Sequence, residues 1–246
     1  MDQIISLRPL LAVVVSLGVI PVLMSSGQRP NVREAWTFFA AIGKFLLVLS
    51  MLPAVLQGRE FVLHLVSIAP GVSLAFRVDG LGMLFALVAS FLWIVTTLYS
   101  IGYMRGLQEH GQTRYFVFFA LALSATIGVA FSANLLTLYL FYELLSLATY
   151  PLVTHHQDQE ARISGRKYLV FILGTSIGLV LPALLICYHL TGTLDFTVQG
   201  ILNGEASGSA LLVLLLMFVL GFAKAGIMPF HSWLPAAMVA PTPVSA

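Results

Sequence analysis

Long apolar blocks, each about twenty residues in length, dominate this sequence. A hydrocarbon core of about 30 Å requires about 20 apolar residues, because a helix rises about 1.5 Å per residue. The blocks therefore predict membrane-spanning helices. Seven of them are expected, at residues 4–24, 35–56, 81–103, 115–131, 134–154, 168–190 and 210–228.

The composition excludes a water-soluble globular protein. Of the 246 residues, 59% are hydrophobic and 9% are charged, whereas an average soluble domain is about 25% charged. The formal net charge of +2 is not that of a nucleic-acid-binding surface. Cys187 is the single cysteine, so it forms no disulfide framework and ligates no redox cluster. We expect an all-α integral membrane protein that holds no cofactor, no metal and no nucleic acid.

Two connections between the blocks carry a structural prediction of their own. Residues 61–76 are apolar, but each half is too short to cross a membrane, and Ala69-Pro70-Gly71 is a turn signal. Two paired strands at the membrane surface are therefore expected there. The fourth and fifth blocks are separated by little more than residues 132–134, which predicts a tight antiparallel helix pair.

The basic residues predict the orientation in the membrane. With the N-terminus outside, seven Lys and Arg residues face the cytoplasm and three face outward. Cytoplasmic loops are the ones enriched in Lys and Arg, so this orientation is favoured. The seven are Arg29, Arg33, Arg105, Arg114, Arg162, Arg166 and Lys167.

The last apolar stretch, residues 210–240, is too long for one ordinary crossing. It contains Gly226, Pro229, His231 and Pro235, and a proline removes a backbone donor and clashes with the preceding turn. We therefore expect a discontinuous seventh helix, followed by the start of a further one. In transporters, helices broken in this way mark ion sites near the bilayer midplane.

Three ionisable side chains lie well inside the expected spans: Lys44, Glu143 and Lys224. A charge at the bilayer centre costs about 2.5–3.5 kcal/mol on insertion scales, so such residues commonly mark proton or ion routes. For Glu143 and Lys224 the alternative is static helix packing, through a buried carboxyl or a salt bridge. For Lys44 a functional role and a packing role are weighed equally.

Histidines offer further candidates. His231 follows Pro229 in the broken region and is a candidate relay partner, because an imidazole titrates near neutral pH. A lone histidine is more often a hydrogen-bonded structural residue. His155 and His156 form a proton-collecting surface, a weak metal site or a solvated loop. The solvated loop is favoured, because adjacent histidines do not have the spacing of the usual metal motifs.

Three motifs resemble a known family of membrane proteins. The strongest is KAGIMPFHSWLP at residues 224–235, which continues as APTPVSA at residues 240–246. The others are NLL and YEL within residues 134–144, and RKYL at residues 166–169. In these the chain is similar to the antiporter-like membrane subunits of the superfamily that unites complex I and the multisubunit (Mrp-type) cation/proton antiporters.

The resemblance implies a proton pathway built from two inverted five-helix repeats. Glu143 matches the family's glutamate of the fifth helix, and Lys224 matches the lysine of the broken seventh. Their implied roles are a charge that tunes the lysine and a lysine that accepts and donates the proton. The corresponding division is an N-terminal region, residues 1–110, and a first, incomplete repeat, residues 111–246.

Within the superfamily, the second span looks most like the D-type antiporter subunit, through REAW at 33–36, KF at 44–45 and LSMLP at 49–53. The alternative is a proton-pumping subunit of a complex I-type NADH:quinone oxidoreductase or a membrane-bound hydrogenase. Either implies other membrane subunits as partners, protons and Na⁺ or another monovalent cation, and a bacterial inner membrane. Ala236-Ala237 departs from the family's Asp-Ala, and the family's second repeat is missing, which predicts an N-terminal fragment.

Overall fold

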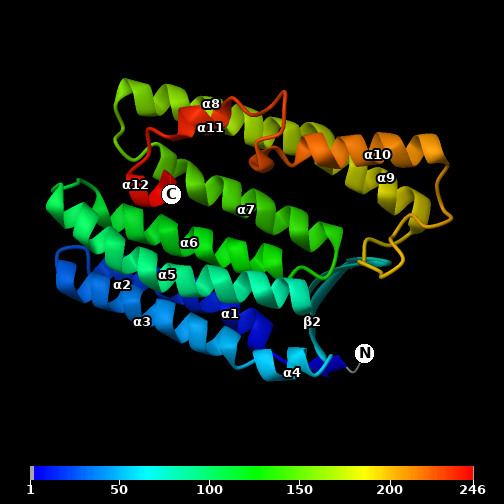
Figure 1. The fold of residues 1–246 in the computed structure, drawn as a ribbon, viewed down its shortest axis with the longest axis horizontal. Coiled ribbons are helices and arrows are strands. Elements are labelled where there is room, and N and C mark those ends of the chain that lie inside the picture. The colour runs from blue at the N-terminus through cyan, green and yellow to red at the C-terminus, as the bar shows by residue number, and fades with distance from the viewer. Residues whose placement is uncertain (1–2, 246) are drawn as a thin grey trace.

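The protein is a bundle of long helices with a small sheet at one end (Figure 1). The computed structural model describes residues 3–245. Six helical segments are long and apolar enough to cross a membrane, which confirms the expected all-α membrane fold. The six segments are Arg8–Ser25, Pro30–Leu56, Gly80–Gly106, Gln112–Ala130, Leu135–Val153 and Gln159–Thr191.

Several of these segments are bent or interrupted. The first segment consists of α1 (Arg8–Gly18) and α2 (Ile20–Ser25), and the second of α3 (Pro30–Leu49) and α4 (Leu52–Leu56). Prolines near the starts of α2 and α4 account for these breaks, because proline lacks the donor that a continuing helix needs. The uninterrupted segments are α5 (Gly80–Gly106), α6 (Gln112–Ala130) and α7 (Leu135–Val153).

The sixth and seventh segments depart most from a regular helix. α8 (Gln159–Thr175) continues through a π-helical turn, η1 (Ser176–Val180), into α9 (Leu181–Thr191). The seventh, α10 (Gly208–Gly221), has only 14 residues and is followed by a short 3₁₀ turn, η2 (Ala223–Ala225). The expected discontinuous helix is therefore present. Two short helices complete the described chain, α11 (Trp233–Ala237) and α12 (Thr242–Ser245).

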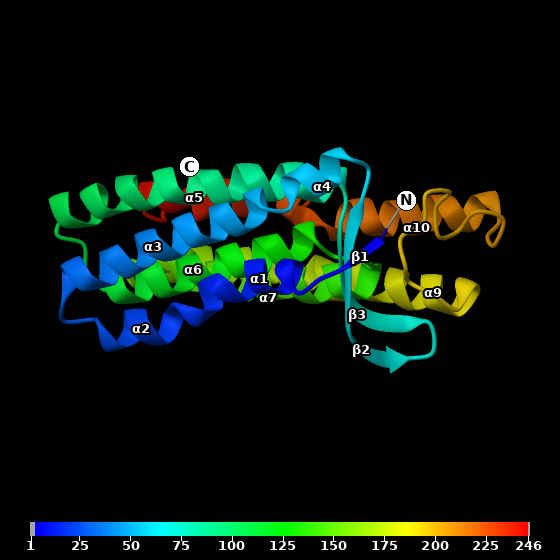
Figure 2. The same cartoon turned by 90° about the horizontal axis from the view of Figure 1, so that it is seen from below.

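The sheet confirms the expected pair of strands. β2 (Glu60–Ala69) and β3 (Val72–Val78) are antiparallel, and β1 (Gln3–Ile5) adds a parallel strand beside β2. Their turn uses Gly71 at a φ of +72°, and a Cβ there would strike the carbonyl of Gly192 at the end of α9. The sheet thus lies across the ends of α5 and α7, against the loop that follows α9, while α9 and α10 extend past it (Figure 2).

Asn134, the capping residue of α7, provides part of the contact between the tight α6–α7 pair and this sheet. The Asn134 side-chain oxygen accepts from the Thr137 backbone N–H at 2.8 Å, and its amide nitrogen donates to the Ser73 carbonyl at 2.7 Å. An asparagine at this position satisfies a free N–H at the helix start. The same residue therefore begins α7 and sets the position of α7 relative to β3.

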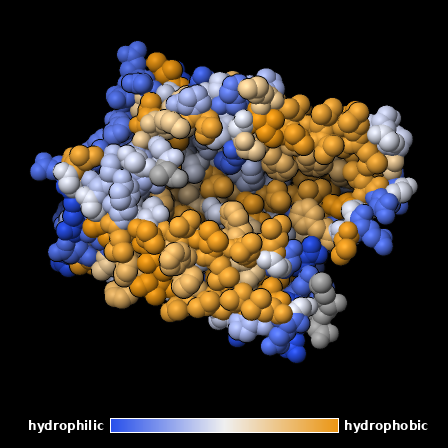
Figure 3. Space-filling model, viewed as in Figure 1, coloured by the Kyte–Doolittle hydropathy of each residue, from blue (hydrophilic) through white to orange (hydrophobic). Residues whose placement is uncertain are grey.

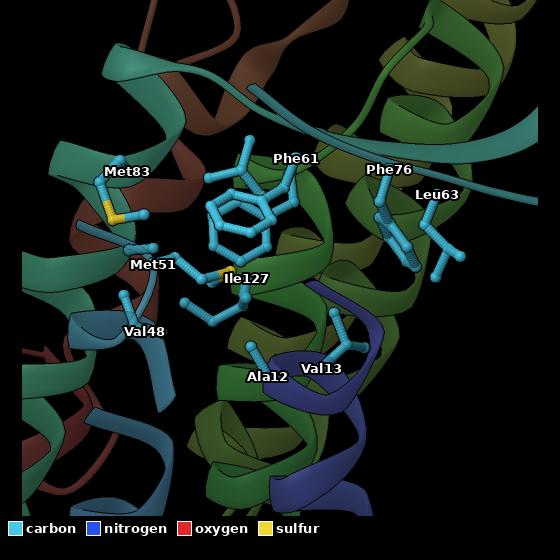
Figure 4. Close-up of a cluster of buried hydrophobic side chains, with 12 residues drawn as sticks. Ala12, Val13, Val48, Met51, Phe61, Leu63, Phe76, Met83 and Ile127 are labelled. Carbon is cyan, nitrogen blue, oxygen red and sulfur yellow. The ribbon is translucent and has the colours of Figure 1, made fainter. Parts of the chain in front are cut away.

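A cluster of apolar side chains fills the space where the sheet meets the helices (Figure 4). Phe61 and Phe76 come from the strands, and Met51, Met83 and Ile127 from the helices and the segment between α3 and α4. Each of the five is at most 2% exposed. This packing fixes the sheet end of the bundle.

At the opposite end, an ion pair between the exposed Arg105 and the buried Glu34 joins α3 to α5. Arg105 donates to both carboxylate oxygens of Glu34, with Nε 2.9 Å from Oε1 and Nη2 2.5 Å from Oε2. Arg33 beside it donates to the Gln112 side-chain oxygen at 2.7 Å. Two parallel bonds hold a guanidinium and a carboxylate in one geometry. Arg33 and Glu34 of the REAW motif therefore hold α3 against α5 and α6.

On the face shown in Figure 3, the middle of the surface is mainly apolar and polar residues collect toward the ends. On α5 alone, Leu84, Phe85, Val88 and Phe91 are each more than half exposed. Such a continuous apolar face suits contact with lipid. The protein is thus a multi-pass membrane protein. The expected division between residues 110 and 111 falls in the loop between α5 and α6, and it stays a prediction.

Two glycines of α5 provide a matched test of the packing. A Cβ at Gly82 would strike the backbone carbonyl of Ala130, whereas one at Gly102 would meet open space. We expect Gly82→Ala to lower the stability by about 1–3 kcal/mol, the usual effect of overpacking. Gly102→Ala should leave it unchanged or slightly raised. Thermal unfolding in detergent measures both, and equal midpoints for the two variants would contradict this packing.

Candidate functional site

The break after α10 contains Lys224, within η2, so the lysine lies inside the irregular segment and not in the helix before it. Two glycines shape the packing and the turn on either side of the break. A Cβ at Gly221 would strike Val180 of η1, so α10 approaches that turn closely there. Gly226 has a φ of +67°, a left-handed conformation that glycine adopts at little cost.

Side chains from neighbouring elements satisfy the backbone that the break sets free. Trp233 Nε1 donates to the Ala223 carbonyl at 2.9 Å. The Thr175 hydroxyl lies 3.1 Å from the Gly221 carbonyl and shares its single proton with the Phe171 carbonyl, 2.7 Å away. Irregular backbone at membrane depth is tolerated only where it is packed in protein or lines a watery cavity. These contacts meet that requirement and fix η2 against α8 and α11.

Aromatic rings and hydroxyls surround the ammonium group of Lys224. Its Nζ donates to the Tyr168 hydroxyl at 3.2 Å and lies 5.0 Å from the centre of the Tyr142 ring. The Tyr142 hydroxyl in turn accepts the Lys224 backbone N–H at 3.3 Å. The Tyr168 and Thr149 hydroxyl oxygens are 2.5 Å apart, so a chain of two hydroxyls leads away from the lysine. Cation–π attraction stabilises an ammonium that is largely removed from water.

Glu143 of α7 faces the π-helical turn. The fully buried Ser176, the first residue of η1, donates its hydroxyl to the Glu143 carboxylate. Single π-turns are frequent at functional sites, because they re-aim side chains within a helix. Among residues 3–245, no ion pair joins Glu143 to Lys224. The carboxylate and the ammonium therefore have separate partners.

A cavity of about 310 Å³ adjoins this group. Lys224, Tyr168 and Thr149 are among its polar lining residues, and Leu145 and Trp233 are among its apolar ones. The ammonium and its two hydroxyl neighbours thus border a space that is large enough for several water molecules.

Lys44 lies in a different part of the bundle. It is fully buried, and its Nζ donates to the Ser16 hydroxyl at 2.6 Å and to the Leu123 carbonyl at 3.2 Å. The ammonium also lies 5.1 Å from the centre of the Trp93 ring. Within the described residues, no acidic side chain forms an ion pair with Lys44.

The histidines are placed at two sites. His231 is exposed in the broken region and forms no side-chain hydrogen bond with any residue between 3 and 245. His155 and His156 gather with Glu109 and His110, two residues that the sequence analysis did not single out. His155 is fully buried, and burial lowers its pKa to about 4, with the charge of Arg114 as a further cause. Its imidazole is therefore neutral at neutral pH.

Comparisons with known proteins identify related membrane subunits. Residues 132–246 match the family described as NADH:quinone oxidoreductase/Mrp antiporter, TM, and residues 68–116 match the NADH-ubiquinone oxidoreductase (complex I), chain 5 N-terminus. The chain belongs to the complex I and Mrp antiporter superfamily of membrane subunits. The matched residues of this superfamily member include Glu143, Lys224 and the whole broken segment.

The superfamily relatives include antiporter subunits. The A subunit of the Na⁺/H⁺ antiporter of Alkalihalophilus pseudofirmus is 35% identical over 182 residues, 72% of this chain and 22% of that protein. The A1 subunit of the Na⁺/H⁺ antiporter of Staphylococcus aureus is 29% identical over 233 residues, 93% of this chain and 28% of that protein. The chain thus spans about a quarter of the length of these relatives.

A solved structure has the same fold. A chain of the membrane-bound sulfane sulfur reductase, an archaeal respiratory membrane complex, aligns with a TM-score of 0.84. The alignment covers 98% of this superfamily member and 49% of that chain, at 20% sequence identity. At this identity the likeness concerns the fold alone. The last residue of the strongest sequence motif, Ala246, lies outside the described residues.

The contribution of the Trp233 hydrogen bond to the stability of the broken segment can be tested directly. Trp233→Phe removes one of the two donors to the buried Ala223 carbonyl, which also accepts the Gly226 backbone N–H at 2.9 Å, so we expect a loss of about 0.5–1.5 kcal/mol, the usual net contribution of one hydrogen bond. We expect a lower thermal midpoint and faster proteolysis within residues 222–232. Trp36→Phe is the matched control, because the Trp36 side chain is 47% exposed on α3. An equal loss of stability in both variants would assign no special role to the Trp233 bond.

Proposed function

We propose that the chain is the proton-translocating part of one membrane subunit of a multisubunit Na⁺/H⁺ antiporter, with Glu143 and Lys224 as the residues that carry the charge. The observation behind this proposal is the position of the Lys224 ammonium, in a broken helix beside a cavity and opposite a helix that carries Glu143. The relatives are named as Na⁺/H⁺ antiporter subunits, which supports the assignment of Na⁺ and H⁺ as the transported ions.

Glu143 and Lys224 have separate hydrogen-bond partners, an arrangement that allows the distance between the two charges to change during transport. Glu143 is bonded to Ser176, and Lys224 to Tyr168, so a movement of α7 against η2 changes their separation without first breaking an ion pair. Two unit charges 4 Å apart attract by about 4 kcal/mol at an effective dielectric constant of about 20. That attraction favours a proton on the lysine when the carboxylate is near, and it weakens as the carboxylate moves away. The hydroxyls of Tyr168 and Thr149 then provide the next positions for the proton.

Among the membrane subunits of such antiporters, we favour the A-type. The second span pattern predicts the D-type, but the relatives described above are named as A or A1 subunits. In addition, Arg33 and Glu34 of that pattern lie in the ion-pair network with α5 and α6, so they have a packing role. The partners would be the other membrane subunits of such an assembly, in a bacterial inner membrane.

The second candidate is a proton-pumping subunit of a redox-driven complex. The matched family covers both classes, and the similar fold comes from a respiratory membrane complex. With Cys187 as its single cysteine, this chain would depend on other subunits for electron transfer. Proton uptake driven by a Na⁺ gradient alone favours the antiporter, and dependence on an electron donor favours the redox complex. The relay roles of His231 and Lys44 stay predictions.

Transport in vesicles tests the central pair. In the complete protein, reconstituted together with its partners, we expect Lys224→Ala and Glu143→Gln each to reduce cation-driven proton flux roughly tenfold or more, since the mobile proton loses its carrier or its counter-charge. Lys167→Ala, an exposed change on α8, is the control. Unchanged flux per assembled complex in the Lys224 and Glu143 variants would mean that the pair is only structural.

The N-terminus-outside orientation is also part of the proposal. In a Cys187→Ser background, we expect Gln28→Cys, in the loop before α3, to resist a membrane-impermeant thiol reagent in right-side-out vesicles. Asn203→Cys, in the loop before α10, should react at once. Both positions are exposed, so accessibility reports the side of the membrane. The reverse pattern would overturn the orientation.

A further inference from the structure

Two loops meet at the end of the bundle that lies opposite the sheet (Figure 1). One loop joins α5 to α6 and contains Glu109 and His110, and the other joins α7 to α8 and contains His155 and His156. Left-handed turns at Gln108, with a φ of 51°, and at Gln157, with a φ of 60°, shape the two loops. This grouping is separate from the Glu143 and Lys224 site, which lies within the membrane span.

The side chains converge on one carboxylate oxygen. Glu109 Oε2 lies 3.7 Å from His156 Nδ1, 3.9 Å from His110 Nδ1 and 3.8 Å from His155 Nε2. The ligand atoms of Glu109, His110 and His156 all lie within 4.8 Å of one another. Ligand atoms around a tetrahedral zinc ion are about 3.4 Å apart, given bond lengths of about 2.1 Å. Small side-chain rotations are therefore enough to bring all three onto one ion.

The buried histidine provides an independent observation. His155 is 0% exposed, and neither of its ring nitrogens has a hydrogen-bond partner among residues 3–245. A buried polar group without a partner costs about 1–3 kcal/mol, so an imidazole in this state needs an explanation. Its Nε2 is directed at Glu109, the residue at the centre of the group. An ion held there, or its bound water, would be within reach of this nitrogen.

The donor set selects a class of ion. Imidazole nitrogens together with one carboxylate oxygen suit Zn²⁺ and its first-row neighbours, whereas Mg²⁺ and Ca²⁺ prefer oxygen ligands alone. Three protein ligands leave one coordination position of a tetrahedral ion open for water. The nearby Arg114 points its Nη2 at the His155 carbonyl, 2.6 Å away, so its guanidinium has a bonding partner of its own.

We propose that Glu109, His110 and His156 form a binding site for a divalent transition-metal ion of the zinc class, with His155 as the buried imidazole behind it. The ion joins the loop between α5 and α6 to the loop between α7 and α8. The site is independent of the proposed transport function, because its ligands lie outside the membrane span and its test requires no ion flux.

Metal titration of the full chain tests the site. The protein is purified in detergent without a polyhistidine tag and titrated with Co²⁺, whose visible absorption reports coordination, and then with Zn²⁺. We expect one equivalent of Co²⁺ to bind and Zn²⁺ to displace it. We expect Glu109→Gln, His110→Asn and His156→Asn each to weaken binding at least tenfold. His64→Asn and His189→Asn, in β2 and α9, are matched controls that leave it unchanged.

Thermal unfolding is a second readout, and it distinguishes a ligand variant that has lost metal binding from one that has failed to fold. Without metal, the ligand variants should unfold at the wild-type midpoint, since Glu109, His110 and His156 lie in loops at the end of the bundle. With saturating Zn²⁺, the midpoint should rise for the wild type and both controls but not for the ligand variants, because an ion that binds only the folded state stabilises it. Absence of saturable binding to the wild type, or wild-type affinity in the three ligand variants, would overturn the proposal.

Discussion

The requirement that every polar backbone group find a partner in an apolar medium governs the centre of this protein. α10 ends at Gly221 and leaves carbonyls and N–H groups that water would satisfy in a soluble protein. Here Trp233, Thr175 and Tyr142 satisfy them, and these residues come from three different segments. Because the break is bonded on several sides, Lys224 is held at a defined position although its own segment is irregular.

The two lysines inside the expected spans have different surroundings. Lys44 and Lys224 both lie inside spans and both face an aromatic ring. Lys44, however, is fully enclosed and bonded to Ser16 and to a carbonyl, an arrangement that fastens α3 to α1 and α6. Lys224 borders a cavity and shares its surroundings with an acidic residue. The surroundings of Lys224 are therefore the ones that the proposed proton transfer requires, and a relay role for Lys44 stays a prediction.

The sequence was sufficient for features that depend on local pattern. The apolar blocks, the strand pair with Gly71 at its turn and the broken seventh helix all follow from hydropathy and from glycine and proline chemistry. The hydrogen-bond and ion-pair partners of the charged residues could not be predicted from the sequence, because those partners come from segments that are distant in the chain. Ser176 reaches Glu143 through a π-turn with no distinctive sequence, and Glu109 meets His156 across more than forty residues of chain. Tyr142 and Tyr168 lay within recognised motifs, but nothing local assigned them to Lys224.

The π-turn between α8 and α9 has a consequence for the whole sixth span. An α-helix turns by about 100° per residue, so one extra residue in a turn rotates everything beyond it by about that angle. α8 can therefore face α7 and α11, while α9 presents a different side to the sheet, where the Tyr188 hydroxyl donates to the Pro70 carbonyl at 2.9 Å. The π-turn therefore changes which side of the helix faces inward between α8 and α9, although the two form one continuous span. Length changes of one residue here would not be neutral, because they would turn one half of the span away from its neighbours.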